Sequence, residues 1–188
     1  MNIFQSQKII KYLVKQNWIR VSMSQDVEKH RKWVRESEFG RSRGIYYLGK
    51  GIIEELGEEK GAALIIKQIE EMGHDSGKAI RKTFESQGLD NNFINYSNRT
   101  DPSNSVYNFA WVGGIKKSTD YERVVEYSFC PIAEGFRMLG EDGKKVGELF
   151  CNHIDNAVIQ GYNSDFECKR ESSLNFNGLC RLHFKKKR

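Results

Sequence analysis

The residues best suited to chemistry in this sequence are cysteines, and the first of them stands where a strand pattern changes to a helix pattern. In YSFCPIAEGFRMLG, residues 127–140, Cys130 comes directly before Pro131. Proline is favoured at the first position of a helix, so Cys130 is expected at the N-cap. Backbone N–H groups and the helix dipole stabilise an anion there, which predicts a lowered thiol pKa and a nucleophilic thiolate. A small buried core residue is the alternative.

A second set of chemical groups lies in CNHID, residues 151–155, within a helix predicted from about Val146 to Gln160. Cys151 lies at the edge of the apolar arc of this helix, and Asp155 follows one turn later on the same side. Such a carboxylate can accept a proton from a thiol, a water or a substrate nitrogen. His153 falls inside the apolar arc and points away from this pair, so a hydrogen-bonded core position competes with a substrate-binding role.

The other two cysteines belong to strand patterns near the end of the chain. Cys180 alternates with Leu182 and Phe184, which places it on an inward face that either fills the core or lines a pocket. Cys168 alternates with Phe166 in the same way, and we interpret it as structural.

The elements that must position these groups change character halfway along the chain. Helix formers dominate from Ser24 to Leu56 and again from EEKGAALIIKQIEEMG to Gly88, with Gly73 and Gly77 as expected breaks or kinks. A polar loop is predicted at about 89–105.

Strand patterns follow the loop, in SVYNFAWV and YERVVEYSFC, with Gly113-Gly114 between them. In the second run one face carries Arg123, Val125, Tyr127 and Phe129, and the other carries Val124, Glu126, Ser128 and Cys130.

The last 23 residues or so, DFECKRESSLNFNGLCRLHFKKK, predict two strands joined at Asn177-Gly178. A two-residue turn would oppose Phe176 to Leu179, whereas a loop one residue longer would pair Phe176 with Cys180. The order of elements predicts an α+β fold in which N-terminal helices pack on an antiparallel sheet with two short helices inserted between strands. We expect a helical part, residues 1–88, and an α+β part, residues 89–188, that carries the site, within one compact domain.

Composition narrows the class of protein. The 188 residues carry 30 Lys and Arg against 25 Asp and Glu, a net charge of +5, and much of this excess sits at 185–188. We expect a solvated terminus there and no nucleic-acid partner. AALII at 62–66 is too short to span a bilayer, and the N-terminus lacks a secretory pattern, so a cytoplasmic protein without a membrane partner is expected. Four free thiols without a CxxC pair or a His/Cys cluster predict no metal site, and no cofactor motif is present. The sequence leaves open whether the protein forms a homo-oligomer.

The stretches FCPIAEGFRMLG, LFCNHID and LNFNGLCRLHF resemble the L-2-amino-thiazoline-4-carboxylic acid hydrolase family, as does the helical GIYYLGKGIIEELGEEKGAALIIKQIEEMGHDSGKAI. The resemblance covers roughly residues 40–185. It implies hydrolysis of a small cyclic isothiourea or amidine, in which C2 of the ring is attacked and an N-carbamoyl-cysteine is released.

The resemblance implies catalytic roles for Cys130, Cys151 and Asp155. Either a thiolate attacks the substrate, or Asp155 activates water while a thiol donates a proton. Cys180 and His153 are candidate substrate contacts. Arg170 and Arg181 are candidate partners for a substrate carboxylate, on grounds of chemical need alone.

Two other classes of function remain open from the sequence. The late Gly-x-Cys strand also resembles small-molecule-binding domains related to vinyl reductases, which bind ligands without turnover. Free thiols beside a carboxylate could also handle a soft metal such as mercury or copper(I).

Overall fold

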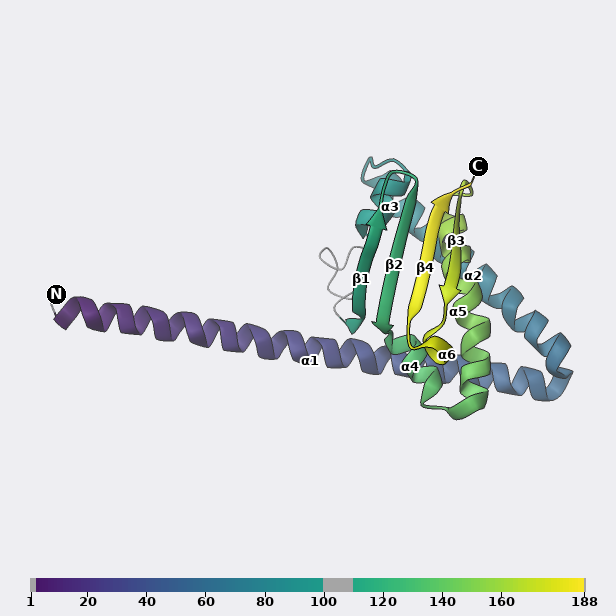
Figure 1. Ribbon diagram of the computed structural model, residues 1–188, viewed down its shortest axis with the longest axis horizontal. Coiled ribbons are helices and arrows are strands. Elements are labelled where there is room, and N and C mark those ends of the chain that lie inside the picture. Colours follow the sequence, from purple (N-terminus) through teal and green to yellow (C-terminus); the bar gives the residue numbers. More distant parts are fainter. Residues whose placement is uncertain (1–2, 100–109, 188) are drawn as a thin grey trace.

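Two long helices form the N-terminal part of the protein. The computed structural model describes residues 3–99 and 110–187, with side chains described for residues 26–98 and 110–187. Helix α1 (Ile3–Leu56) and helix α2 (Glu58–Ser86) meet at Gly57, whose φ of 80° allows the sharp turn. The predicted helical character is confirmed, and α1 begins well before Ser24. Its first turns extend away from the sheet (Figure 1).

Helix α2 runs without interruption through Gly73 and Gly77, so the expected break is wrong. These glycines face helix α5 (Gly140–Tyr162). A Cβ on Gly77 would lie 2.1 Å from the carbonyl oxygen of Val158, and one on Gly73 would lie 2.5 Å from the Cβ of Ala157. The two glycines therefore allow α2 and α5 to pack closely.

The predicted polar loop at 89–105 contains a helix, α3 (Phe93–Arg99). The side chain of Asn92 caps it, because Asn92 Oδ1 accepts a hydrogen bond from the backbone N–H of Asn95 at 2.9 Å. Phe93 and Tyr96 are buried on its inner side. Tertiary packing of two aromatic rings therefore stabilises a helix that the polar composition concealed, while residues 100–105 of the predicted loop lie outside the described residues.

The second half forms a four-stranded antiparallel sheet in the order β1-β2-β4-β3 (Figure 1). Two helices are inserted between β2 and β3: the short α4, and α5, which begins at Gly140 instead of Val146. The predicted α+β class is confirmed. The bounds are β1 (Val112–Ser118), β2 (Glu122–Phe129), α4 (Pro131–Arg137), β3 (Phe166–Ser172) and β4 (Cys180–Lys186).

The first strand differs from its prediction. Gly113 and Gly114 lie inside β1 and do not separate two strands. Gly113 has a φ of 148° and sits where the register of β1 against β2 shifts, as in a β-bulge. Of the predicted strand at 105–112, residues 105–109 lie outside the described residues, and Trp111 directly precedes β1.

The C-terminal strands pair antiparallel as predicted, but the predicted turn between them is wrong. A short helix, α6 (Leu174–Asn177), follows β3, and Ser173 Oγ accepts a hydrogen bond from the N–H of Asn175 at 3.1 Å. Gly178, with a φ of 67°, ends this helix. The ladder pairs Arg170 with Leu182, so neither of the two expected registers forms.

Two apolar clusters hold the layers together. One lies between the inner face of the sheet and helices α2, α3 and α5, and the other joins α1, α2, α4 and α5. The first cluster is centred on Phe84, Tyr96, Ile159, Tyr162, Phe166 and Phe184, and the second on Tyr46, Ile65, Ile69, Phe136, Val146 and Phe150. Each cluster includes residues before and after position 88. The predicted division of the chain into two parts at position 88 stays a prediction.

Within the described ranges, no helix has the length and apolar character that crossing a membrane would require.

Candidate active site

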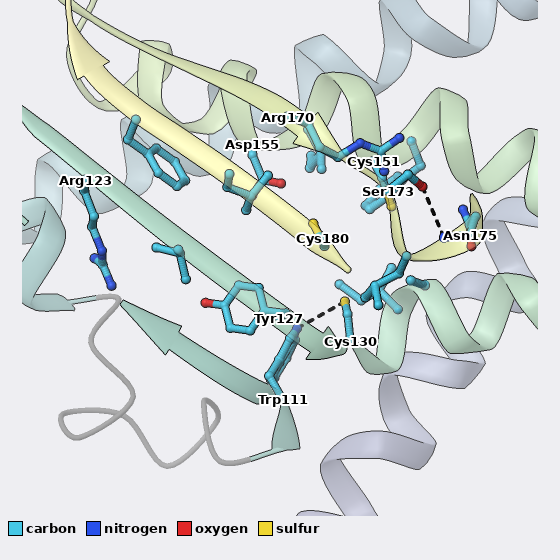
Figure 2. A pocket seen from close by; sticks show the side chains of 18 of the residues that line it. Trp111, Arg123, Tyr127, Cys130, Cys151, Asp155, Arg170, Ser173, Asn175 and Cys180 are labelled. Carbon is cyan, nitrogen blue, oxygen red and sulfur yellow. Dashed lines mark hydrogen bonds between the residues drawn. The ribbon is translucent and has the colours of Figure 1, made fainter. Parts of the chain in front are cut away.

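A cavity of about 250 Å³ lies between the inner face of the sheet and helices α4, α5 and α6. It is smaller than the pockets that hold drug-sized ligands, so it suits a small molecule. Three of the four cysteines line it, from three separate stretches of the chain, together with a carboxyl and a guanidinium group (Figure 2). The chemical groups that the sequence singled out and that line this cavity are Cys130, Cys151, Asp155, Arg170 and Cys180.

Cys130 is the N-cap of α4, with Pro131 at the first position, as predicted. Its thiol lies beyond the end of β2 and lines the cavity, so it does not follow the strand alternation expected for it. Trp111 Nε1 donates a hydrogen bond to Cys130 Sγ at 3.2 Å (Figure 2).

The predicted lowering of the Cys130 pKa is wrong. Burial raises the pKa of this thiol, and it outweighs the hydrogen bonds from the backbone N–H groups of Ala133 and Ile132 and from Trp111, which act in the other direction. Loss of hydration therefore destabilises the thiolate by more than the helix N-terminus stabilises it. Cys130 is a neutral thiol at pH 7.

Cys151 and Asp155 lie one turn apart on the side of α5 that faces the cavity, as the helical wheel predicted. Burial raises the pKa of Asp155 to about 6, and the nearby Arg170 and Arg41 guanidinium groups limit the rise. Burial, with the neighbouring Cys130 second, raises the pKa of Cys151 well above its ordinary value. The pair is thus a carboxyl that titrates near neutrality beside a protonated thiol.

Cys180 opens strand β4 and stands opposite Tyr127 of β2 in the ladder. It faces the cavity, as Leu182 and Phe184 do, which answers the question of core or pocket in favour of the pocket. Burial raises the pKa of Cys180 to about 12. The cavity therefore holds three neutral thiols at pH 7.

Arg170 reaches the cavity from the inner face of β3, and its side chain is only 7% exposed. Its Nη2 forms an ion pair with Glu148, and its Nε donates a hydrogen bond to Asn152 Oδ1 at 3.0 Å. Both partners stand on α5, one turn apart. The guanidinium group is therefore held on two sides.

Three of the other residues considered from the sequence lie outside this cavity. His153 Nδ1 is 2.9 Å from Glu70 Oε1 of α2. Arg181 is on the outer face of the sheet, where it forms ion pairs with Glu126 and Glu171. Cys168 packs against the first apolar cluster. The structure thus brings together five of the seven candidate site residues and leaves His153 and Arg181 apart.

Sequence reasoning missed several groups that line or support the cavity. A usable signal stood in the sequence, because polar residues recur on α5 at spacings of three and four and form a stripe facing β3. No such spacing signal exists for Trp111, Ser173 and Asn175. The α5 stripe comprises the predicted Cys151 and Asp155 and the missed supporting residues Glu148, Asn152 and Asn156. The missed groups that line the cavity itself include Arg41, Trp111, Arg123, Tyr127, Ser173 and Asn175.

The thiols do not assemble a metal centre in the part of the chain that the structure describes. Across residues 3–99 and 110–187, no group of three or more His, Cys, Asp and Glu side chains is arranged to hold a metal ion. The thiols and Asp155 share a cavity without forming a ligand cage.

The fold is α+β, and its central cavity is lined by three thiols, by a carboxyl group whose pKa is raised, and by an arginine whose side chain is paired with α5. The sequence model described as "L-2-amino-thiazoline-4-carboxylic acid hydrolase" matches residues 42–184. The chain belongs to this family. No curated protein matches the chain.

The fold also occurs in a protein of another kind. A trafficking protein particle complex subunit 3 from Naegleria fowleri, solved covalently bound to palmitic acid, superposes with a TM-score of 0.54. The match is 12% identical and covers 81% of this chain and 96% of that chain. At that identity the likeness concerns the fold alone.

Proposed function

We propose that this protein hydrolyses a small cyclic isothiourea or amidine of the 2-amino-thiazoline-4-carboxylate type inside the central cavity. Membership of the hydrolase family supports a hydrolytic activity. The observation that carries the proposal is the convergence of Asp155, Cys130 and Cys151 on one cavity of small-molecule size. These groups come from the N-cap of α4 and from α5, and both helices pack in the second apolar cluster.

The pKa directions favour one of the two chemical routes. A thiolate nucleophile requires a low pKa, whereas burial raises the pKa of both Cys130 and Cys151. A general base is most effective with a pKa near the working pH, and Asp155 has a pKa of about 6. We therefore assign Asp155 as the base and a neutral thiol as the proton donor.

In this route Asp155 takes a proton from water as the oxygen attacks C2 of the ring, and a C2–O bond forms. The bond between C2 and the ring sulfur then breaks. The ring nitrogen gains the proton that Asp155 took from water, and the departing sulfur gains a proton from a neighbouring thiol. The hydroxyl on C2 becomes the carbonyl of the product, and the proton that it loses restores that thiol. One water is consumed, and the product is an N-carbamoyl-cysteine. Cys180 and Arg170 are the proposed substrate contacts, and His153 and Arg181 have no role in it because they lie outside the cavity.

The test is formation of N-carbamoyl-cysteine from L-2-amino-thiazoline-4-carboxylate, followed by mass spectrometry. Asp155→Asn should lower the rate by about 100-fold or more, as expected for loss of a general base. Asp75→Asn is the matched control, since Asp75 is exposed on α2 and does not line the cavity, and it should keep the wild-type rate. The wild-type rate should rise through about pH 6 and level off above it, because only ionised Asp155 accepts a proton.

Two outcomes would contradict this assignment. A covalent adduct of substrate on Cys130 or Cys151, seen in the intact mass, would restore the thiolate route. Full activity in Asp155→Asn would remove the base from the mechanism.

Binding without turnover is the second candidate function. Neutral buried thiols are poor nucleophiles, and the same fold is found in a trafficking complex subunit solved with covalently bound palmitic acid. A binding module would show a ligand-dependent rise in Tm and no product in the assay above.

A further inference from the structure

The cavity has a polar end built around one carboxylate that does not itself line it. Glu148 of α5 accepts hydrogen bonds from the side chains of Arg170 and Ser173, and from Asn175 Nδ2 at 2.7 Å. All three donors line the cavity. They come from the end of β3 and from the segment leading into α6, so a single carboxylate orders the end of one strand and the loop that follows it.

The hydrogen bonds to Glu148 also fix the orientation of its partner side chains. A carboxylate only accepts hydrogen bonds, so the amide nitrogen of Asn175 must face it. Ser173 Oγ donates to Glu148 and accepts the N–H of Asn175, which fixes its hydroxyl. Glu148 also neutralises the buried charge of Arg170, which could not stay buried without a partner.

Arg170 keeps donors for a ligand after these contacts are made. A guanidinium group carries five N–H donors in one plane, and within the described residues the hydrogen bonds of Arg170 are those from Nε to Asn152 and from Nη2 to Glu148. With both contacts directed to α5, the fork is held in one orientation at the cavity wall. A planar anion such as a carboxylate is the ligand that matches such a fork.

We propose that Arg170, oriented by Glu148 and Asn152, is the anion anchor that makes this site select substrates bearing a carboxylate. Glu148 is a positioning residue in this scheme, since it acts on the ligand only through Arg170, Ser173 and Asn175. The inference rests on the proposed function for the identity of the ligand. It does not depend on turnover, because an anchor sets binding preference whether or not the ring is opened.

The experiment compares two ligands that differ only in the carboxylate: L-2-amino-thiazoline-4-carboxylate and 2-amino-2-thiazoline. Kd values are measured by calorimetry on the full chain, with Asp155→Asn present in the reference protein and in every variant so that the acid is not hydrolysed during the titration. The reference protein, with Arg170 intact as in the wild type, should prefer the acid at least about tenfold, the size expected for a charge-assisted hydrogen bond in a buried site. Arg170→Gln should abolish that preference by weakening the acid alone.

Arg181→Gln is the matched control, because Arg181 lies on the neighbouring strand, is also paired with glutamates, and faces away from the cavity. It should keep the wild-type preference. Arg170→Lys, which keeps the charge but lacks the planar fork, should restore part of the preference.

Glu148→Gln tests the positioning role, and should weaken the acid several-fold with little change for 2-amino-2-thiazoline. If that variant folds poorly, Asn152→Ala replaces it, because Asn152 is exposed and supports Arg170 from the other side.

Retention of the acid preference in Arg170→Gln would overturn the anchor, as would a reference protein that binds neither ligand or both alike. Equal weakening of both ligands in Glu148→Gln, or in Asn152→Ala where it replaces that variant, would overturn the positioning role. Preferential binding of the acid without product formation would instead refute the hydrolase and leave the anchor standing.

Discussion

Trp111 Nε1 donates a hydrogen bond to Cys130 Sγ across 3.2 Å, joining the residue that precedes β1 to the residue that follows β2. Indole N–H groups usually find a partner when they are buried, and here the partner is a cavity thiol. The contact links the start of β1 to the end of β2, next to the first residue of α4. It also opposes the effect of burial on Cys130, since a donated hydrogen bond favours the thiolate.

Trp111→Phe should therefore raise the pKa of Cys130 further. We expect wild-type Cys130 to react with iodoacetamide at pH 7 more slowly than a free cysteine derivative, because burial keeps it protonated. In the variant, the pH midpoint of the reaction should move upward. Peptide-resolved mass spectrometry of alkylation across a pH series measures that midpoint independently of simple access. A midpoint below that of free cysteine would contradict the neutral thiol at this position.

Asp155→Asn should stabilise the folded protein at pH 7.5 while it removes activity. The pKa of Asp155 is raised from 3.8 to about 6, so between these values the folded state binds more protons than the unfolded state. Stability contributed by this group is thus complete below about pH 4 and is lost as the pH rises to about 6. The loss is on the order of 3 kcal/mol, since one pKa unit corresponds to about 1.4 kcal/mol.

Thermal unfolding at pH 7.5 and pH 4 measures this effect. The variant should melt several degrees above wild type at pH 7.5, and the gap should narrow at pH 4. Asp75→Asn is the control, because Asp75 is exposed on α2 and pairs only with the exposed Lys78 within the described contacts. Equal Tm values for Asp155→Asn and wild type at both pH values would show that Asp155 ionises freely.

The sequence predicted the parts of this site that depend on local rules. The N-cap position of Cys130 followed from Pro131, and the shared face of Cys151 and Asp155 followed from helical spacing. The inward face of Cys180 followed from strand alternation. Each of these depends on neighbours within a few residues, which one chain is enough to reveal.

The predictions that failed concern features that depend on contacts between residues distant in the sequence. Burial raises the pKa of Cys130 and outweighs the hydrogen bonds at the helix N-terminus, so the helix N-terminus alone gave the wrong sign. The hairpin at Asn177-Gly178 gave way to α6, because Ser173 and Asn175 are held by Glu148 of a different helix. A single sequence records neither the burial nor the partner.

Gly113→Ala should disrupt the edge of the sheet that supports Trp111. Gly113 has a φ of 148°, which side chains with a Cβ rarely adopt, and the new Cβ would lie 2.0 Å from the carbonyl oxygen of Glu126. We expect a loss of about 2 kcal/mol or more in the free energy of unfolding. Gly114→Ala is the control one residue away, where no atom lies within 4 Å of the added Cβ, and it should be neutral. Urea unfolding of both variants measures the difference, and equal stabilities would show that β1 has no strained bulge at Gly113.

Gly77→Ala should separate α2 from the helix that carries Cys151 and Asp155. In an unconstrained helix this substitution gains up to about 1 kcal/mol, and Gly51→Ala should do so, because Gly51 is exposed on α1 with no atom within 4 Å of the added Cβ. At Gly77 the added Cβ would lie 2.1 Å from the carbonyl oxygen of Val158, which is backbone and cannot rotate away. We expect overpacking to outweigh the helix preference, with a net loss of about 2 kcal/mol. Urea unfolding of Gly77→Ala and Gly51→Ala should shift in opposite directions, and a stabilised Gly77→Ala would mean that α2 and α5 are not packed backbone to backbone at this point.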